Sequence, residues 1–186
     1  QSFIVEARTG ADGALAALAV KEAAPDGYSL FSGSLLSRHP VMSKNNVVIG
    51  GKDLSPIADY MAQPTYIYVR SSLGPKTFAE LLAYSKAHAP GTLNWGSQSP
   101  NQDIALELIK ARSGLTVTNV RFRGAPINEL LNGTIDLAMS SITAFYPQVQ
   151  AGKIIPVVGT SRLQLAPQVP TLTELSLPQL PEVRLG

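Results

Sequence analysis

Short apolar runs that alternate with helical segments constrain the fold of this chain more than any other feature. The strand-like runs cover residues 3–7, 28–32, 66–70, 93–96, 118–122, 135–139 and 155–159. The helical segments cover residues 14–24, 77–88, 102–113, 127–132 and 145–151. Strands separated by helices are typical of βαβ units. The sequence therefore predicts an α/β protein whose sheets are mostly parallel and flanked by helices.

Cap and turn residues support the limits of these segments. Thr77 is followed three residues later by Glu80, which is the spacing of a capping box at the start of the helix over 77–88. From residue 162 on, prolines separate short apolar pieces. Because proline blocks long helices and central strands, we expect a connector there, with one short helix near residues 172–175.

The composition is that of a folded protein without a strong charge. Of 186 residues, 45% are hydrophobic and 15% are charged, and the net charge is +2. Without a dense stripe of Lys and Arg, no nucleic-acid partner is expected. No apolar run is long enough to span a bilayer. The chain has no cysteine and only two histidines, and its acids do not cluster, so we expect no disulfide, no metal site and no cofactor.

The familiar motifs of enzymes are also missing from the sequence. It contains no G-x-S-x-G, no H-E-x-x-H, no phosphate-binding loop and no dinucleotide fingerprint. We therefore expect a protein without catalytic residues that is not an enzyme.

The loop over residues 94–103 joins a predicted strand to the helix that follows it. Its hydroxyl and amide side chains lie beside the free N–H groups of a helix N-terminus, and such donors suit a carboxylate. The candidate ligand-binding residues here are Ser97, Gln98, Ser99 and Asn101, with Gln102 as a further donor. The alternative is an ordinary helix cap at Ser99 or Asn101 that binds no ligand.

Other predicted strand exits carry further candidates. Ser34, Ser140 and Ser141 follow strands, where open α/β sheets bind their ligands; the alternative is that they are simple turn residues. Arg123 offers a planar fork of donors that can pair with a carboxylate, or else it forms a surface or interdomain salt bridge. Asp136 lies inside an apolar strand and is expected to be structural, bonding to nearby backbone.

Four short segments, spread in order over nearly the whole chain, resemble one protein family. They are I-V-E-A-R-T-G-A-D-G at 4–13, A-A-P-D-G-Y-S-L at 23–30, K-D-L-S-P-I at 52–57 and V-P-T-L-T-E at 169–174. The chain is similar to the solute receptors of tripartite tricarboxylate transporters, which are the TctC-like receptors of the Bug family. Their order makes this resemblance far more specific than any one of the segments.

The resemblance implies the two-lobe architecture of type II periplasmic binding proteins. One lobe would hold residues 1–65 and 163–186, and the other would hold residues 66–162, with hinge strands near 66–70 and 155–159. Compared with the family, the first lobe is incomplete: the chain lacks a first strand, a ligand-contacting loop and a helix, as well as the family's C-terminal part. We expect either a fragment of a longer receptor, or a shortened protein that re-pairs its strands or completes its sheet with a second copy.

The family also implies a function. The chain would be an extracytoplasmic receptor that captures a small carboxylate between two lobes and delivers it to the subunits of a membrane transporter. The ligand would be a di- or tricarboxylate, an amino acid or an aromatic acid, held first by Ser34, Ser97 and Arg123. The protein would be periplasmic, exported by a signal peptide that this chain does not include. The alternative is a degenerate relative that acts as a non-transporting sensor or interaction module and could be dimeric.

Overall fold

The computed structural model describes residues 2–10, 13–33, 53–162, 164–180 and 183–185. The chain divides into two compact units, one formed by Gln1–Ala62 with Val183–Gly186 and the other by Gln63–Glu182. We call them unit 1 and unit 2 and describe each by itself. The lobe limits expected from the resemblance stay a prediction.

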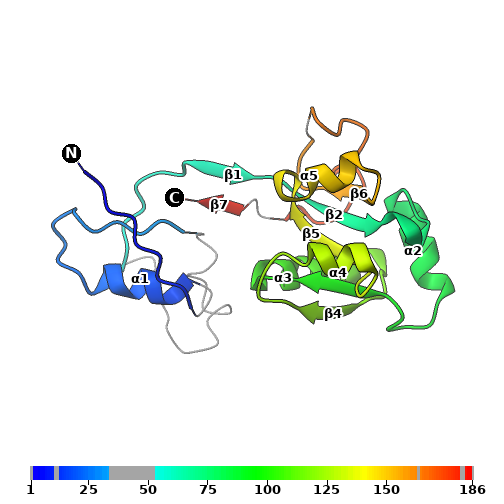
Figure 1. Ribbon diagram of the computed structural model, residues 1–186, viewed down its shortest axis with the longest axis horizontal. Coiled ribbons are helices and arrows are strands. Elements are labelled where there is room, and N and C mark those ends of the chain that lie inside the picture. Colours follow the sequence, from blue (N-terminus) through cyan, green and yellow to red (C-terminus); the bar gives the residue numbers. More distant parts are fainter. Residues whose placement is uncertain (1, 11–12, 34–52, 163, 181–182, 186) are drawn as a thin grey trace. The chain divides into compact units, whose positions relative to one another are not determined.

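Unit 2 is built on a five-stranded sheet with the order β4-β3-β5-β2-β6 (Figure 1). Its strands are β2 (Thr65–Arg70), β3 (Asn94–Ser97), β4 (Thr118–Arg121), β5 (Leu137–Ser141) and β6 (Ile154–Gly159). β3 pairs in parallel with β4 and β5, whereas β2 pairs antiparallel with both β5 and β6. Four strands therefore share one direction and β2 opposes them.

Helices cover both faces of this sheet. Successive residues of a strand point to opposite faces, so alternate residues of β2 pack against different helices. The helices are α2 (Phe78–Ala87), α3 (Pro100–Ser113), α4 (Ile127–Asn132) and α5 (Ile142–Gln150), with a short 3-10 helix, η4, at Ser71–Leu73. In β2, Ile67 and Val69 join the core cluster that contains α2 and α3. Tyr66 and Tyr68 join the cluster that contains α4 and α5.

The proline-rich segment over residues 164–180 packs on unit 2. Leu172 and Leu180 are buried in the cluster of α2 and α3. The Leu172 N–H donates to the Gly159 carbonyl at 2.9 Å, which ties the segment to the end of β6. Residues 164–180 therefore belong to unit 2.

The prediction of a short helix near residues 172–175 is wrong. The structure has a hydrogen-bonded turn there, in which the Leu175 N–H donates to the Thr171 carbonyl at 3.2 Å. The backbone then enters the left-handed region at Ser176, with φ of 55°, so a helix cannot continue. Thr171 and Glu174 close the turn by bonding to each other's N–H groups at 2.9 and 3.2 Å.

Unit 1 holds α1 (Ala14–Lys21), together with a two-stranded sheet of β1 (Met61–Gln63) and β7 (Val183–Leu185). Ala14 and Ala17 form the buried side of α1. The Lys21 ammonium at the end of this helix pairs with the Asp53 carboxylate at 3.1 Å.

The predictions of strands at residues 3–7 and 28–32 are wrong, because the structure has no strand in either run. Their apolar side chains face solvent: Val5 is 96% exposed and Tyr28 is 83% exposed. A strand exists only when a neighbour pairs with its backbone, and no other described segment forms a ladder with either run. The two runs also form no ladder with each other, so the re-pairing alternative finds no support in the described residues.

Candidate functional site

Three neighbouring strands of unit 2 end at the same edge of the sheet. β3 and β4 are in register at their last residues, since Ser97 lies opposite Arg121. β5 is the other parallel neighbour of β3 and ends at Ser141. In open α/β sheets the carboxyl ends of parallel strands are where ligands bind, so this edge is the candidate site.

Two helices begin at this edge without a side-chain cap. The residue before α3 is Ser99, and the residue before α5 is Ser141; neither side chain caps its helix by accepting a backbone N–H of the first turn. By contrast, the Thr77 hydroxyl caps α2 by accepting the Glu80 N–H at 3.2 Å. The first N–H groups of a helix carry a partial positive charge. At α3, Pro100 has no N–H and the Gln102 N–H already donates to the Ser99 carbonyl at 3.0 Å. The start of α5 has no acidic residue in its first turn, so it is the part of this edge better suited to an anion.

Gln102 ties the turn between β3 and α3 to β5. Its side-chain oxygen accepts the Gln98 N–H at 2.7 Å, and its side-chain nitrogen donates to the Met139 carbonyl at 2.9 Å. The side chain is buried, so both bonds form away from water. Gln102 therefore fixes the loop over residues 97–101 beside the end of β5, where Ser140 and Ser141 lie.

Asp103 collects three hydrogen bonds in the first turn of α3. Its carboxylate accepts from the Ser97 hydroxyl at 2.6 Å and from the Asn119 amide at 2.7 Å. The Arg121 guanidinium donates to the other oxygen at 2.8 Å and forms an ion pair with it. The sequence analysis missed Asp103. The sequence did offer a signal: Asn119 and Arg121 are two residues apart on β4, so they share one face of that strand and could together bind an acidic side chain.

The structure brings most of the predicted ligand-binding residues to this edge. Ser97 is fully buried, and its hydroxyl is held by Asp103. Gln98 and Ser99 in the turn, and Asn101 in the first turn of α3, are half-buried. Ser140 is buried at the end of β5, and the Ser141 hydroxyl lies 3.2 Å from that of Thr143.

The two remaining candidates differ from these. Arg123 lies two residues beyond β4 and is exposed, and within the described part of the chain it forms no hydrogen bond or ion pair. Its guanidinium is therefore available to a ligand. Ser34 lies outside the residues that the structure describes.

Asp136 lies at the opposite end of the sheet, just before β5, and its role there is structural, as the sequence predicted. One carboxylate oxygen accepts from Arg70 Nε at 2.9 Å and Nη2 at 2.8 Å. The other accepts the Asn94 N–H at 2.9 Å. The pair joins the end of β2 and the start of β3 to the start of β5.

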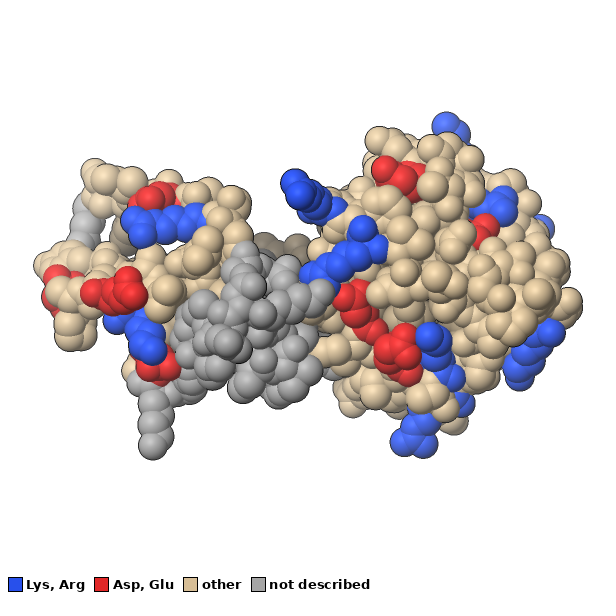
Figure 2. Space-filling model, turned by 90° about the horizontal axis from the view of Figure 1, so that it is seen from below, with Lys and Arg blue, Asp and Glu red and all other residues tan. Residues whose placement is uncertain are grey.

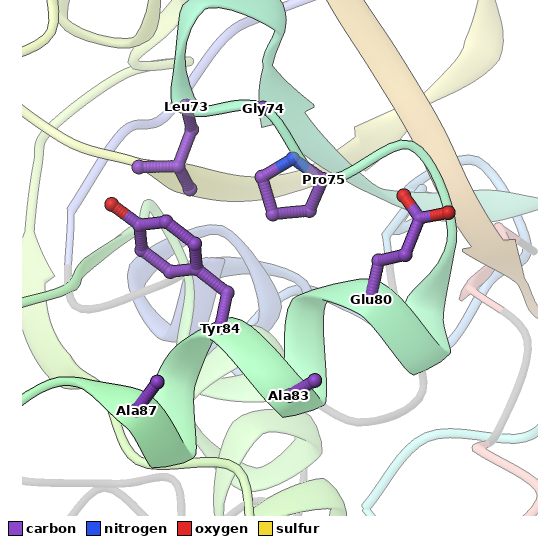
Figure 3. Close-up of a pocket in the computed structure, with 7 residues that line it drawn as sticks. All are labelled: Leu73, Gly74, Pro75, Glu80, Ala83, Tyr84 and Ala87. Carbon is purple, nitrogen blue, oxygen red and sulfur yellow. The ribbon is translucent and has the colours of Figure 1, made fainter.

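A shallow hollow between η4 and α2 is a poorer candidate site (Figure 3). Its lining is Leu73, Gly74, Pro75, Glu80, Ala83, Tyr84 and Ala87. The lining is mostly apolar, and the Glu80 carboxylate already accepts the Lys76 N–H at 2.7 Å. It follows the end of β2, which runs opposite to β5, so it lies at the end of the sheet away from the candidate site.

The charged side chains do not gather into one patch on the face of unit 2 that Figure 2 shows, where basic and acidic groups lie side by side. In the described ranges, no group of three or more His, Cys, Asp or Glu side chains is arranged to hold a metal ion. None of the helices described is long and apolar enough to cross a membrane.

A family profile described as "Tripartite tricarboxylate transporter family receptor" matches residues 1–181. The chain therefore belongs to this family. A UPF0065 protein of Bordetella bronchiseptica is 29% identical over 180 residues, covering 94% of this chain and 53% of the relative. A UPF0065 protein of Agrobacterium vitis is 31% identical over 183 residues, covering 94% and 52%. The chain thus spans about half the length of the curated relatives it matches.

Solved structures agree with the predicted fold class. MatC from Rhodopseudomonas palustris, solved with bound malate, is 27% identical with a TM-score of 0.77, over 95% of this chain and 63% of that one. Rpa4515 of the same organism, solved with adipate, is 25% identical with a TM-score of 0.74, over 100% and 64%. A periplasmic transporter at 24% identity has a TM-score of 0.81, over 95% and 62%, and supports the fold alone. The expected fold class, an α/β protein of the periplasmic-binding-protein type, is confirmed.

Proposed function

We propose that this chain is a non-catalytic solute-binding receptor for a small carboxylate. The observation that carries the proposal is the pair of uncapped helix starts, α3 and α5, after adjacent strands of unit 2. Exposed Arg123 adds a cation that forms no ion pair within the described residues. A carboxylate can accept hydrogen bonds from backbone N–H groups and from a guanidinium together.

The membership of the family supports the same class of ligand. Two of its similar structures were solved with malate and with adipate, which are dicarboxylates. We therefore place di- and tricarboxylates first among the ligands, ahead of amino acids and aromatic acids. Ser97, Gln98, Ser99, Asn101, Ser140 and Ser141 would line the site in unit 2, and Ser34 would contribute from elsewhere.

The finer steps of the function follow from the family. The receptor would close two lobes on its ligand, with each lobe adding part of the binding free energy, and would present the closed form to the membrane subunits of a tripartite transporter. It would act in the periplasm.

The test is calorimetric titration and thermal unfolding of the chain with malate, adipate, citrate, glutamate and benzoate. A ligand present at 100 times its dissociation constant stabilises the folded state by about 2.7 kcal/mol. Arg123→Gln should weaken binding by roughly tenfold, since a charge-assisted bond is lost. Arg112→Gln, which removes an exposed arginine from the far end of α3, is the matched control and should leave binding unchanged.

The competing function is a non-transporting sensor or interaction module. Its supporting observation is that Asp103 already holds the Ser97 hydroxyl and the Arg121 guanidinium. Absence of binding to every acid by a folded sample, together with a dimer in sedimentation analysis, would favour it over the receptor.

A further inference from the structure

The Asp103 carboxylate already occupies three hydrogen-bond donors beside the candidate site. Asp103 lies in the first turn of α3. Its partners, at 2.6 to 2.8 Å, are a hydroxyl on β3 and an amide and a guanidinium on β4. These are the donor types that would hold a carboxylate ligand. The protein has thus placed one of its own carboxylates on the α3 side of the edge.

This carboxylate is also within reach of solvent. The side chain of Asp103 is 28% exposed and that of Arg121 is 32% exposed. A ligand at the edge can therefore approach the negative charge, which pairs with the Arg121 guanidinium among the described residues. The α5 side differs, because its first turn contains no acidic residue and Ser141 does not cap it.

We propose that Asp103 is a specificity-determining residue of this site, which rests on the carboxylate-receptor function proposed above. The negative charge of Asp103 disfavours a second carboxylate on the α3 side and favours a neutral or ammonium group there. The ligand's own carboxylate goes to the start of α5 and to Arg123. Like-charge repulsion is a common source of such discrimination.

A pair of ligands with the same four-carbon spacer tests the proposal. Adipate has a carboxylate at each end, whereas 5-aminopentanoate has one carboxylate and one ammonium. Asp103→Asn removes the charge and keeps the shape, so it should raise the affinity for adipate relative to 5-aminopentanoate by roughly tenfold. Glu107→Gln is the control, since it removes the same charge one turn further along α3 and should leave the affinity ratio within about twofold.

Arg121→Gln provides a test in the opposite direction, and it keeps the proposal falsifiable if Asp103→Asn does not fold. It leaves the Asp103 charge unbalanced, so the ratio should shift toward 5-aminopentanoate. A purely structural role for Asp103 would weaken both ligands equally and leave the ratio unmoved, which would overturn the proposal. If the wild-type chain binds carboxylates but the ratio stays constant, only this inference fails. If the folded wild-type chain and its variants bind no carboxylate, the proposed function fails with it.

Discussion

Asp136 and Arg70 form a partly buried ion pair whose loss we expect to be costly. The Asp136 side chain is 9% exposed and bonds to both the Arg70 guanidinium and the Asn94 N–H. Asp136→Asn leaves the Arg70 charge without its partner, so the free energy of unfolding should fall by about 3 kcal/mol in urea titrations. Glu107→Gln, at an exposed pair on α3, should change it by less than about 0.5 kcal/mol. Equal effects of the two changes would contradict a structural role for Asp136.

Tyr68 has a buried hydroxyl without a hydrogen-bond partner in the described part of the chain. Its ring packs on Phe145 with centroids 4.9 Å apart. Tyr68→Phe keeps this packing and removes the unpaired group, so the folded state should gain about 1 kcal/mol of stability. Tyr66→Phe is the counterpart, because the Tyr66 hydroxyl donates to the Ser161 carbonyl at 3.0 Å and its loss should cost about 1 kcal/mol. A destabilised Tyr68→Phe variant in thermal or urea unfolding would argue against this account.

Burial also raises the pKa of the Tyr68 hydroxyl well above its usual range, with a smaller contribution from Tyr66. The unfolded chain ionises its tyrosines near pH 10, whereas folded Tyr68 stays neutral there. Stability from this group is therefore complete below about pH 10 and is lost as the pH rises toward the raised folded value. Urea unfolding between pH 8 and pH 11 should show this decline, and Tyr68→Phe should reduce its slope. A slope that the variant leaves unchanged would assign the decline to other groups.

At the scale of elements, the turn between β3 and α3 depends on Gln102. Gln102→Ala leaves the Gln98 N–H and the Met139 carbonyl without their partner, so unfolding free energy should fall by about 2 kcal/mol. Gln102→Glu should not rescue it, since a carboxylate cannot donate to the Met139 carbonyl. Calorimetry should show weaker carboxylate binding in both variants. Asn101→Ala should leave stability within about 0.5 kcal/mol, and a similar loss there would mean that the turn does not depend on Gln102.

The elements of unit 2 were largely predictable from the sequence because each signal there agrees with its tertiary context. The helix at Ile127–Asn132 and the strand at Thr118–Arg121 lie within a residue of their expected limits. α5 begins at Ile142, before the predicted 145, because burial of Ile142 and Phe145 holds a helix that contains Pro147. The runs at 3–7 and 28–32 have strand composition, but pairing is a property of two segments and cannot be predicted from one.

The candidate site was predictable to the same degree. Parallel strands end at one edge, so the sequence could group Ser97 with Ser140 and Ser141. It could not show that Asp103 meets Asn119 and Arg121, because that contact depends on the rotation of α3 over its neighbouring strand. The hydrogen-bonded cluster around Asp103 was therefore visible only in three dimensions.

At the scale of the whole molecule, the two units differ in how they bury their apolar residues. β2 lies inside unit 2, where Tyr66, Ile67, Tyr68 and Val69 are no more than 2% exposed. In unit 1, Phe3, Ile4 and Val5 are at least 80% exposed. Amides that pair inside a buried sheet exchange with solvent only through large unfolding events, whereas unpaired amides exchange freely.

Hydrogen exchange measured by mass spectrometry should therefore separate the two units of this chain. The amides of β2, which pair with β5 and β6, should be protected by at least about a thousandfold over an unstructured peptide. The amides of residues 3–7 should exchange at nearly unprotected rates, because no described segment pairs with them. The amides of α1 provide an internal reference, since they bond within a helix of the same unit. Protection at residues 3–7 equal to that of β2 would require a partner strand and would contradict the exposed arrangement; a second copy could then be sought by repeating the exchange at higher protein concentration.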